Sequence, residues 1–236
     1  MSNKKISDKD RKDVKKEMDS YYKNQKDYYT NLLEYENRVK NNLEEYIPYI
    51  EKANSILDVG CGSGTLCLFL SKKYPDKKIC GVDISPQGIN LAKKEAMKNN
   101  CKIEYKLSDI EKKIDFNNNH FDLVISHEVI EHLNYPENMI KEVWRVCKSK
   151  GIAIIIAPNL FLFSPLRIKF SKIIDILLNK QKLTFIEPDL QKLLEDNDAI
   201  YLTTPWEIRK MLTKTGFKII NIIRSYFSCK IIAQKR

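Results

Sequence analysis

Glycine is scarce in this sequence, since only 7 of the 236 residues are glycine, against the ~7% usual in proteins. Long apolar runs are missing as well, because none approaches the ~20 residues that a membrane-spanning helix needs. The first twenty residues hold no apolar stretch either, so we expect no secretory signal and a cytoplasmic location. These absences argue against a membrane-spanning or secreted protein.

Metal-ligand patterns are also missing. The six cysteines form no CxxC pair, and three histidines, His120, His127 and His132, are too few for an elaborate metal centre. Four of the cysteines lie in apolar runs, which indicates buried, reduced thiols. We therefore expect neither a disulfide framework nor a bound metal ion.

The basic excess of the chain is confined to one end. The formal net charge is +10, and residues 206–236 hold eight basic residues against one acidic residue. Residues 46–158 hold sixteen basic and fourteen acidic residues. A protein that binds nucleic acid usually carries a basic stripe around its working site, and no such stripe is present here. Nucleic acid is therefore a disfavoured partner.

The chain divides into a helical N-terminal segment and an α/β domain. Residues 1–45 carry apolar positions at helical spacing, which predicts one or two amphipathic helices that form either a helical cap over a neighbouring site or a solvated extension. From residue 55 short apolar strands alternate with helical patterns, and this predicts a doubly wound, mainly parallel sheet within a domain over 46–236. Residues 159–204 interrupt the alternation and predict an inserted helical lid.

The expected elements are short and follow one another closely. They are strands at 55–59, 78–83, 102–107, 121–126 and 151–157, helices at 65–74, 86–98, 136–148 and 206–215, and a final antiparallel strand pair at 217–223 and 227–235.

Three of the glycines cluster between the first strand and the first helix of this alternation. Gly60, Gly62 and Gly64 allow a sharp turn and the close approach of a ligand, and the following helix offers N–H groups to an anion. Asp83 ends the next strand, 19 positions beyond Gly64. This spacing is close to the ~20 expected for a carboxylate that binds both hydroxyls of a ribose. The sequence therefore predicts a nucleotide-type site.

Two more acids extend this predicted site. Asp58 precedes the glycine loop, and Asp109 follows the third strand, where it can accept a hydrogen bond from an exocyclic amine. Three acids, each just beyond the carboxyl end of a predicted parallel strand, are expected to converge on one crevice.

The ordered motifs ILDVGCGSGTL, GVDIS, LSDIE, FDLVISHEVIEHL and GIAIIIAPN resemble those of the class I S-adenosylmethionine-dependent methyltransferases. The resemblance covers residues 50–160 and resumes at 201–235. It implies a seven-stranded Rossmann-like sheet, S-adenosylmethionine as the cofactor, and methyl transfer by in-line displacement. It also implies that the glycine loop holds the methionine end, Asp83 the ribose, and Asp109 with Ile110 the adenine. By the same resemblance, Asp58 supports either the loop or the methionine amino group. The cofactor-binding residues that it implies are Asp58, Gly60, Cys61, Gly62, Ser63, Gly64, Asp83, Ile84, Asp109, Ile110, Ser126 and His127.

The segment His127–His132 holds the candidates for a catalytic base. His127 and Glu131, or Glu128 and His132, are four residues apart and would share one face of a helix. Three interpretations stay open: His127 or His132 is a general base for a protonated acceptor, the segment only closes the cofactor pocket, or it binds a metal. The metal interpretation is weakened because no histidine follows His132.

The methyl acceptor is expected to be a small or lipid-like molecule. Members of the family insert substrate-specifying structure at the position of residues 159–204. The basic amphipathic stretch over 159–182 suggests either contact with a membrane surface or a lid helix packed on the domain. Two alternative functions remain: an RNA methyltransferase that uses the basic residues of 206–236, and a non-catalytic scaffold that binds the cofactor. A nicotinamide oxidoreductase is disfavoured because the third glycine comes one position early for GxGxxG. No feature of the sequence indicates which oligomeric state the protein adopts.

Overall fold

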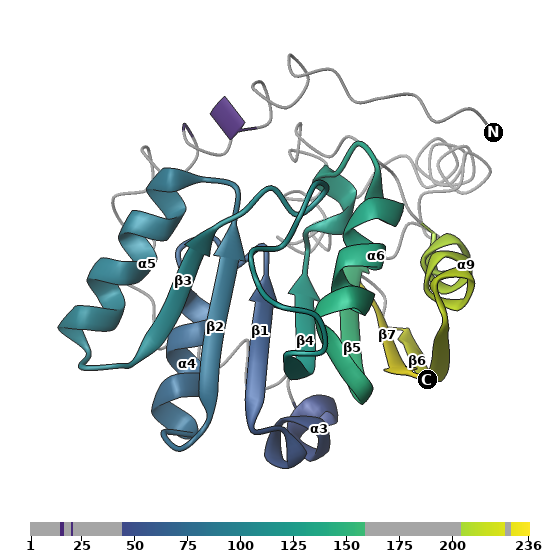
Figure 1. The fold of residues 1–236 in the computed structure, drawn as a ribbon, viewed down its shortest axis with the longest axis horizontal. Helices are drawn as coiled ribbons and strands as arrows, with labels where there is room; N and C mark the ends of the chain where they lie inside the picture. The colour runs from purple at the N-terminus through teal and green to yellow at the C-terminus, as the bar shows by residue number, and fades with distance from the viewer. Residues whose placement is uncertain (1–14, 17–19, 21–43, 159–203, 225–227) are drawn as a thin grey trace, which may run out of the picture.

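A computed structural model of the chain describes residues 15–16, 20, 44–158, 204–224 and 228–236, and its centre is a seven-stranded sheet (Figure 1). The strand order is β3-β2-β1-β4-β5-β7-β6. The strands from β3 to β5 are parallel, and β7 runs antiparallel to both β5 and β6. This arrangement confirms the predicted doubly wound, mainly parallel sheet with an antiparallel pair at one end. Because the chain runs outward from β1 to β3 and then returns to β4, the order reverses between β1 and β4, where such sheets bind ligands.

The bounds of the elements are close to those expected from the sequence. The strands are β1 (Ser55–Val59), β2 (Lys78–Asp83), β3 (Ile103–Leu107), β4 (Phe121–His127), β5 (Cys147–Pro158), β6 (Phe217–Arg224) and β7 (Ser228–Lys235). The described helices include α3 (Ile47–Lys52), α4 (Thr65–Lys73), α5 (Pro86–Lys98), α6 (Pro136–Val146) and α9 (Pro205–Thr215), with the short 3-10 helices η1 (Glu44–Tyr46) and η2 (Ile130–His132).

Local sequence signals set several helix ends. The Ser85 side chain precedes α5 and accepts a hydrogen bond from Gly88 N at 3.1 Å, and Pro86 occupies the first turn. Thr204 starts α9 with a capping box. The same helix ends at Gly216, whose φ of +111° is left-handed. These helices therefore begin and end at residues that favour such positions.

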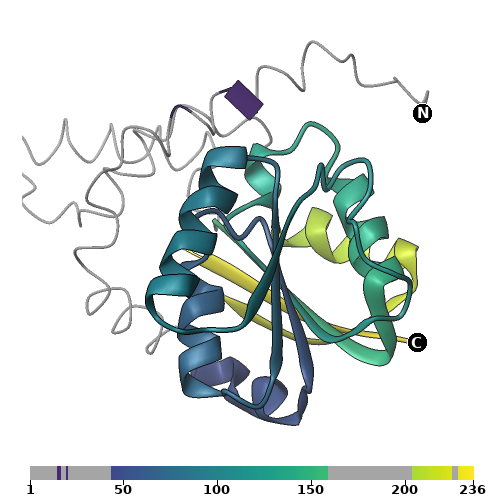
Figure 2. The ribbon, with the colours of Figure 1, turned by 60° about the vertical axis from the view of Figure 1, so that its left-hand side comes forward.

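Helices cover both faces of the sheet (Figure 2). On one face, η1, α3, α4 and α5 pack against a core that includes Tyr46 and Ile154. On the other face, α6 and α9 pack against a core that includes Ile155 and Leu212. Because both faces are covered, the centre of β5 is an unbroken apolar run and not an alternating one.

The structure corrects one predicted boundary. The pattern predicts a helix over 136–148 and a strand from 151, but α6 ends at Val146 and β5 begins at Cys147. Cys147 pairs with Phe121 in the ladder between β4 and β5, and the register shifts before Leu123. A hydrogen-bonded partner distant in sequence therefore takes Cys147 out of the helix, which a local pattern does not show.

Two predicted segments lie outside the described residues: the helical cap over 1–45, apart from a few positions and its last two residues, and the lid over 159–204, apart from Thr204. In the part of the chain that the structure describes, no helix is long and apolar enough to cross a membrane. The six cysteines are not disulfide-bonded, and five of them are buried, one more than the four that lie in apolar runs of the sequence; Cys101 is half-buried.

Candidate functional site

The glycine loop connects the end of β1 to the start of α4. Gly60, Gly62 and Gly64 have φ angles of +76°, +52° and +80°, in the left-handed region that glycine adopts without steric cost. The N–H groups of Gly60 and Cys61 both donate to the Val82 carbonyl, at 2.8 and 2.9 Å. The clustered glycines therefore fold the chain into a tight turn against β2, in agreement with their spacing.

Two of these glycines are packed so closely that a side chain has no room. A Cβ on Gly64 would overlap the Tyr105 hydroxyl and lie 2.8 Å from the Ala92 Cβ. A Cβ on Gly60 would overlap the side chain of Val129. Since Val129 belongs to the His127–His132 segment, the glycine loop and that segment touch each other. The structure thus brings together the two motifs that the sequence singles out.

Asp83 is the last residue of β2 and lies beside the glycine loop. Its carboxylate accepts hydrogen bonds from Gly62 N and Ser85 N, each at 2.8 Å. The side chain is buried, and Ser108 N donates to the Asp83 carbonyl at 2.8 Å. Asp83 is therefore held in one orientation between the glycine loop, the start of α5 and the segment that follows β3.

The segment after β3 carries Asp109 and Ile110 next to Ser108. The Asp109 carboxylate accepts a hydrogen bond from Glu111 N at 3.2 Å and lies 3.8 Å from Lys112 Nζ. Ile110 is buried in the core on the α6 face. Part of the Asp109 hydrogen bonding is therefore used within its own turn, a role that an acid commonly has at such a position.

Asp58 lies inside β1, one residue before the strand ends, as the strand predicted over 55–59 requires. It does not lie beyond the strand, as we expected for the three converging acids, because the ladder with β2 and β4 continues through Val59. The Asp58 side chain is buried, and the Cys67 thiol of α4 donates to its Oδ2 at 3.5 Å. Burial raises the pKa of Asp58 to about 7; the hydrogen bond from Cys67 lowers it, and the nearby Asp83 raises it.

The His127–His132 segment is not an α-helix. His127 is the last residue of β4, Glu128 has a left-handed φ of +53°, and only η2 is helical. The predicted pairs on one helical face, His127 with Glu131 and Glu128 with His132, are therefore wrong. The ladder between β4 and β5 is the physical reason, because His127 pairs with Ile156 and Glu128 N donates to the Ile156 carbonyl at 3.0 Å.

His127 lies in the same row of the sheet as a buried lysine. His127 pairs with Ile156, and Ile156 pairs with Lys230 of β7, so the three side chains share one face. Lys230 forms an ion pair with Glu45 at 3.0 Å. Burial lowers the pKa of His127; Glu128 opposes this shift, and Lys230 adds to it. Burial therefore favours the neutral form of the imidazole, although 31% of its side chain is exposed.

Lys230 and its partners were not predicted from the sequence. Glu45 lies at the end of the segment assigned to the helical cap, and the fully buried Tyr46 has its ring centre 5.4 Å from Lys230 Nζ. A signal was available, because Lys230 interrupts the apolar run of a strand. A lysine in a buried strand needs a partner for its ammonium group.

One of the predicted residues, Ser126, points away from the site, and three others are partly or fully buried. The buried Ser126 hydroxyl contacts Met139 Sδ on α6 at 3.8 Å, so its side chain lies on the sheet face opposite to His127. Ser63 is buried in the glycine loop, 3.5 Å from Thr65 Oγ1. Ile84 and His132 are half-buried. Among the described residues, no group of three or more His, Cys, Asp and Glu side chains is arranged to hold a metal ion.

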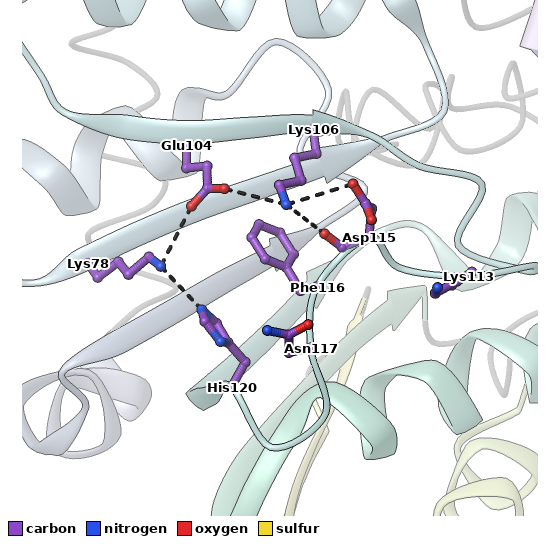
Figure 3. Close-up of a pocket in the computed structure, with 8 residues that line it drawn as sticks. All are labelled: Lys78, Glu104, Lys106, Lys113, Asp115, Phe116, Asn117 and His120. Carbon is purple, nitrogen blue, oxygen red and sulfur yellow. Dashed lines mark hydrogen bonds and ion pairs between the residues drawn. The ribbon is translucent and has the colours of Figure 1, made fainter.

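A polar cavity lies elsewhere, near the amino-terminal ends of β2 and β4 (Figure 3). It encloses about 220 Å³ and is lined by Lys78, Glu104, Lys106, Lys113, Asp115, Phe116, Asn117 and His120. Glu104 lies 3.6 Å from Lys78 Nζ and 3.5 Å from Lys106 Nζ, and Lys78 Nζ contacts His120 Nε2 at 3.2 Å. Because its acids and lysines pair with one another, we interpret this cavity as a surface ion-pair network.

The comparison with protein families decides to which family the glycine loop and Asp83 belong. Residues 50–227 match the family model described as a methyltransferase domain, so the match includes the glycine loop, Asp83, Asp109 and the His127–His132 segment. The chain belongs to the class I S-adenosylmethionine-dependent methyltransferases. The family and fold class predicted from the sequence are therefore confirmed.

Curated relatives align with somewhat under half of this methyltransferase. The ajmaline N-methyltransferase of Rauvolfia serpentina is 38% identical over 45% of this chain and 37% of its own length. The ubiquinone biosynthesis O-methyltransferase of Pelagibacter ubique is 35% identical over 44% of this chain and 42% of its own length. A ribosomal protein L11 methyltransferase of Dictyoglomus turgidum is 36% identical over 45% of this chain and 33% of its own length. The match thus spans less than half of the length of each relative.

Solved structures resemble this methyltransferase over most of its length. A protein from Pyrococcus horikoshii OT3 has a TM-score of 0.67 at 21% identity, over 92% of this chain and 99% of that one. The magnesium protoporphyrin IX methyltransferase of Synechocystis, solved with bound SAH, has a TM-score of 0.64 at 18% identity, over 96% and 100%. At these identities the likeness shows the shared fold.

Proposed function

We propose that this methyltransferase moves a methyl group from S-adenosylmethionine to a small-molecule or lipid-like acceptor. Two relatives are named for reactions of that class, an ajmaline N-methyltransferase and a ubiquinone biosynthesis O-methyltransferase. A third is named for a ribosomal protein, so a protein is the competing class of acceptor.

The basic C-terminal residues give little support to an RNA acceptor. Lys230 is buried in its ion pair with Glu45. Lys235 is also buried and donates to the carbonyls of Trp144 and Cys147, at 2.7 and 2.8 Å. These two cations hold the fold together and are not presented to a phosphate backbone, which lowers the charge available for nucleic acid.

The residues around the glycine loop fit S-adenosylmethionine by their chemistry. The glycine loop presents backbone that a methionine group can approach closely. The Asp83 carboxylate is an acceptor held in place, which suits the two hydroxyls of a ribose. Ile84 follows Asp83 in the chain and Ile110 follows Asp109, and these apolar side chains suit the faces of an adenine. When bound, S-adenosylmethionine supplies a methyl group on a positively charged sulfur, which is a strong electrophile.

In the methyl transfer, the role of the protein is to orient the acceptor and to exclude water. A base is needed only where the acceptor atom carries a proton. His127 meets that need because its imidazole is neutral, partly exposed and joined to the glycine loop through Val129. We infer that His127 Nε2 accepts the proton, with Glu128 Oε1, 3.9 Å away, stabilising the imidazolium. The position of His127 at the end of β4, partly exposed and next to the segment that touches the glycine loop, is the observation that carries this assignment.

The acceptor class is tested with methyl-labelled S-adenosylmethionine and cell extracts separated into lipid, polar-metabolite, protein and RNA fractions. We expect the label to enter the lipid or the metabolite fraction. Label that enters only the protein or the RNA fraction would overturn the proposed acceptor class while leaving the methyltransferase activity in place.

The base is tested on the fraction that accepts the label. We expect His127→Ala to lower turnover by about 10²- to 10⁴-fold and to weaken SAH binding, measured by calorimetry, by a far smaller factor. His120→Ala is the matched control, because His120 lies near the amino end of the same strand, in the polar cavity. Retained turnover in His127→Ala would show that His127 only lines the pocket, and His132→Ala would then test the other histidine.

Contact with a membrane surface through 159–182 is proposed from the sequence alone, since these residues lie outside the described ones. A lipid-like acceptor would favour such contact. We expect the protein to sediment with phosphatidylglycerol liposomes at low salt and a variant lacking 159–182 to stay in solution. Failure of the full chain to sediment would remove this part of the proposal.

A further inference from the structure

Asp58 is a buried acid whose charge is poorly compensated by the residues that the structure describes. Only 4% of the residue is exposed. Its side chain accepts a hydrogen bond from the Cys67 thiol, at 3.5 Å from Oδ2, and a thiol is a weak donor. Among the described residues, no Lys, Arg or His forms an ion pair with Asp58.

The groups that surround Asp58 do not favour a negative charge. From α4 comes Cys67, and from the glycine loop comes Cys61; burial raises the pKa of both thiols, so neither is ionised. From β2 comes the acid Asp83, which repels a second carboxylate. The residues paired with Asp58 in β2 and β4 are Gly81 and Ile125, which have no titratable side chain.

An ionised carboxylate in such surroundings has an unfavourable free energy. An ionised acid that is removed from water and lacks a cation partner takes up a proton instead of staying charged. In agreement with this, burial raises the pKa of Asp58 to about 7. Without a ligand, a large share of the molecules therefore carry a protonated Asp58 at neutral pH.

We propose that Asp58 is a proton-linked positioning residue, which holds a proton in the ligand-free protein and releases it to solvent when a cationic ligand binds at the glycine loop. The inference rests on the proposed assignment of that loop to the methionine end of S-adenosylmethionine. The ammonium group of that end is the positive charge that the carboxylate then faces. In the release step the carboxyl O–H bond breaks, and the proton passes to the buffer.

The size of the effect follows from linkage. With a ligand-free pKa of about 7, binding at pH 7 releases about 0.5 proton, and the affinity is about tenfold lower at pH 6 than at pH 8. The sign is fixed, since protons and the ligand compete for Asp58 and acid weakens binding. SAH carries the same ammonium group as S-adenosylmethionine, so it shows the same release.

The test is calorimetry of SAH binding in two buffers of different ionisation enthalpy, between pH 6 and pH 8, on the full chain and on Asp58→Asn. We expect the full chain to release about half a proton at pH 7 and the variant to release much less. The variant should also lose most of the tenfold pH dependence. Asp76→Asn, the same change at an exposed acid between α4 and β2, is the matched control and should keep both.

Infrared difference spectroscopy of the unaltered chain covers the case in which Asp58→Asn fails to fold. Addition of SAH should remove a protonated-carboxyl band that shifts when aspartate is labelled with ¹³C. Equal proton release in the full chain and in Asp58→Asn, or SAH binding without any loss of that band, would overturn the inference and leave the cofactor assignment intact. A full chain that does not bind SAH would instead overturn the cofactor assignment and the inference with it.

Discussion

A methyl group added at Gly60 tests how the glycine loop and the His127–His132 segment are joined. Gly60 has a φ of +76°, and a Cβ at this position would overlap the Val129 side chain, with Val129 Cγ1 at 2.9 Å. Two costs follow from Gly60→Ala. A left-handed backbone costs a residue with a Cβ about 1–2 kcal/mol, and overpacking costs about 1–3 kcal/mol. We therefore expect the free energy of unfolding to fall by about 2–5 kcal/mol.

A double-mutant cycle separates the two costs. Val129→Ala removes the methyl groups that the new Cβ would meet and leaves the backbone strain unchanged. In that background Gly60→Ala should cost only about 1–2 kcal/mol, so the coupling energy is about 1–3 kcal/mol. Urea unfolding of the four proteins, followed by circular dichroism, measures this energy.

The outcome that refutes the reasoning is additivity. If the two substitutions add within about 0.5 kcal/mol, the Gly60 backbone does not press on Val129, and the two motifs are not coupled in the way described. A cost near zero for Gly60→Ala alone would also contradict the left-handed conformation of the loop.

Three further predictions concern the frame around the site. Ser55→Ala removes the hydroxyl that donates to Asp122 Oδ2 at 2.8 Å and accepts from Asp122 N at 3.1 Å; we expect urea unfolding to show a loss of about 1–3 kcal/mol, and no loss would contradict these bonds. Burial, and then Lys78, lower the pKa of His120 in the folded protein. The contribution of His120 to stability is therefore fully present above pH ~6.5 and is lost as the pH falls through the lower pKa of the folded state. Between pH 7.5 and pH 5.5, urea unfolding should show a smaller loss of stability for His120→Gln than for the unaltered protein, and an equal loss in both would refute the direction of the pKa shift. Thr204→Ala breaks the capping box of α9 and should cost about 1 kcal/mol, whereas Thr204→Ser should restore most of it.

The elements of the fold could be predicted because their signals are local. Gly60, Gly62 and Gly64 follow an apolar run, Pro86 opens a helix, and Gly216 closes one. Each of these residues restricts its own backbone, so a short window of sequence is enough to place it. The order of these signals along the chain is also what indicates the family.

The boundary between α6 and β5 and the shape of the His127–His132 segment could not be predicted in this way. In both cases a residue adopts the conformation that a distant strand requires: Cys147 pairs with Phe121, and His127 pairs with Ile156. Local helical preference is weak beside a ladder of hydrogen bonds in a buried sheet. The four-residue spacing of His127 and Glu131 therefore predicted a shared helical face wrongly, because His127 lies in an extended strand.

By itself the sequence determined the sheet, the glycine loop and the identity of the acids beside it. Only the tertiary structure decided their chemical state. It buried Asp58 beside Asp83 and two thiols, and it placed Lys230, from the far end of the chain, in the row of His127. The charge of a titratable group depends on how much water it keeps and on which charges lie near it. Both are set by residues that are remote in the sequence and become neighbours only when the sheet has formed.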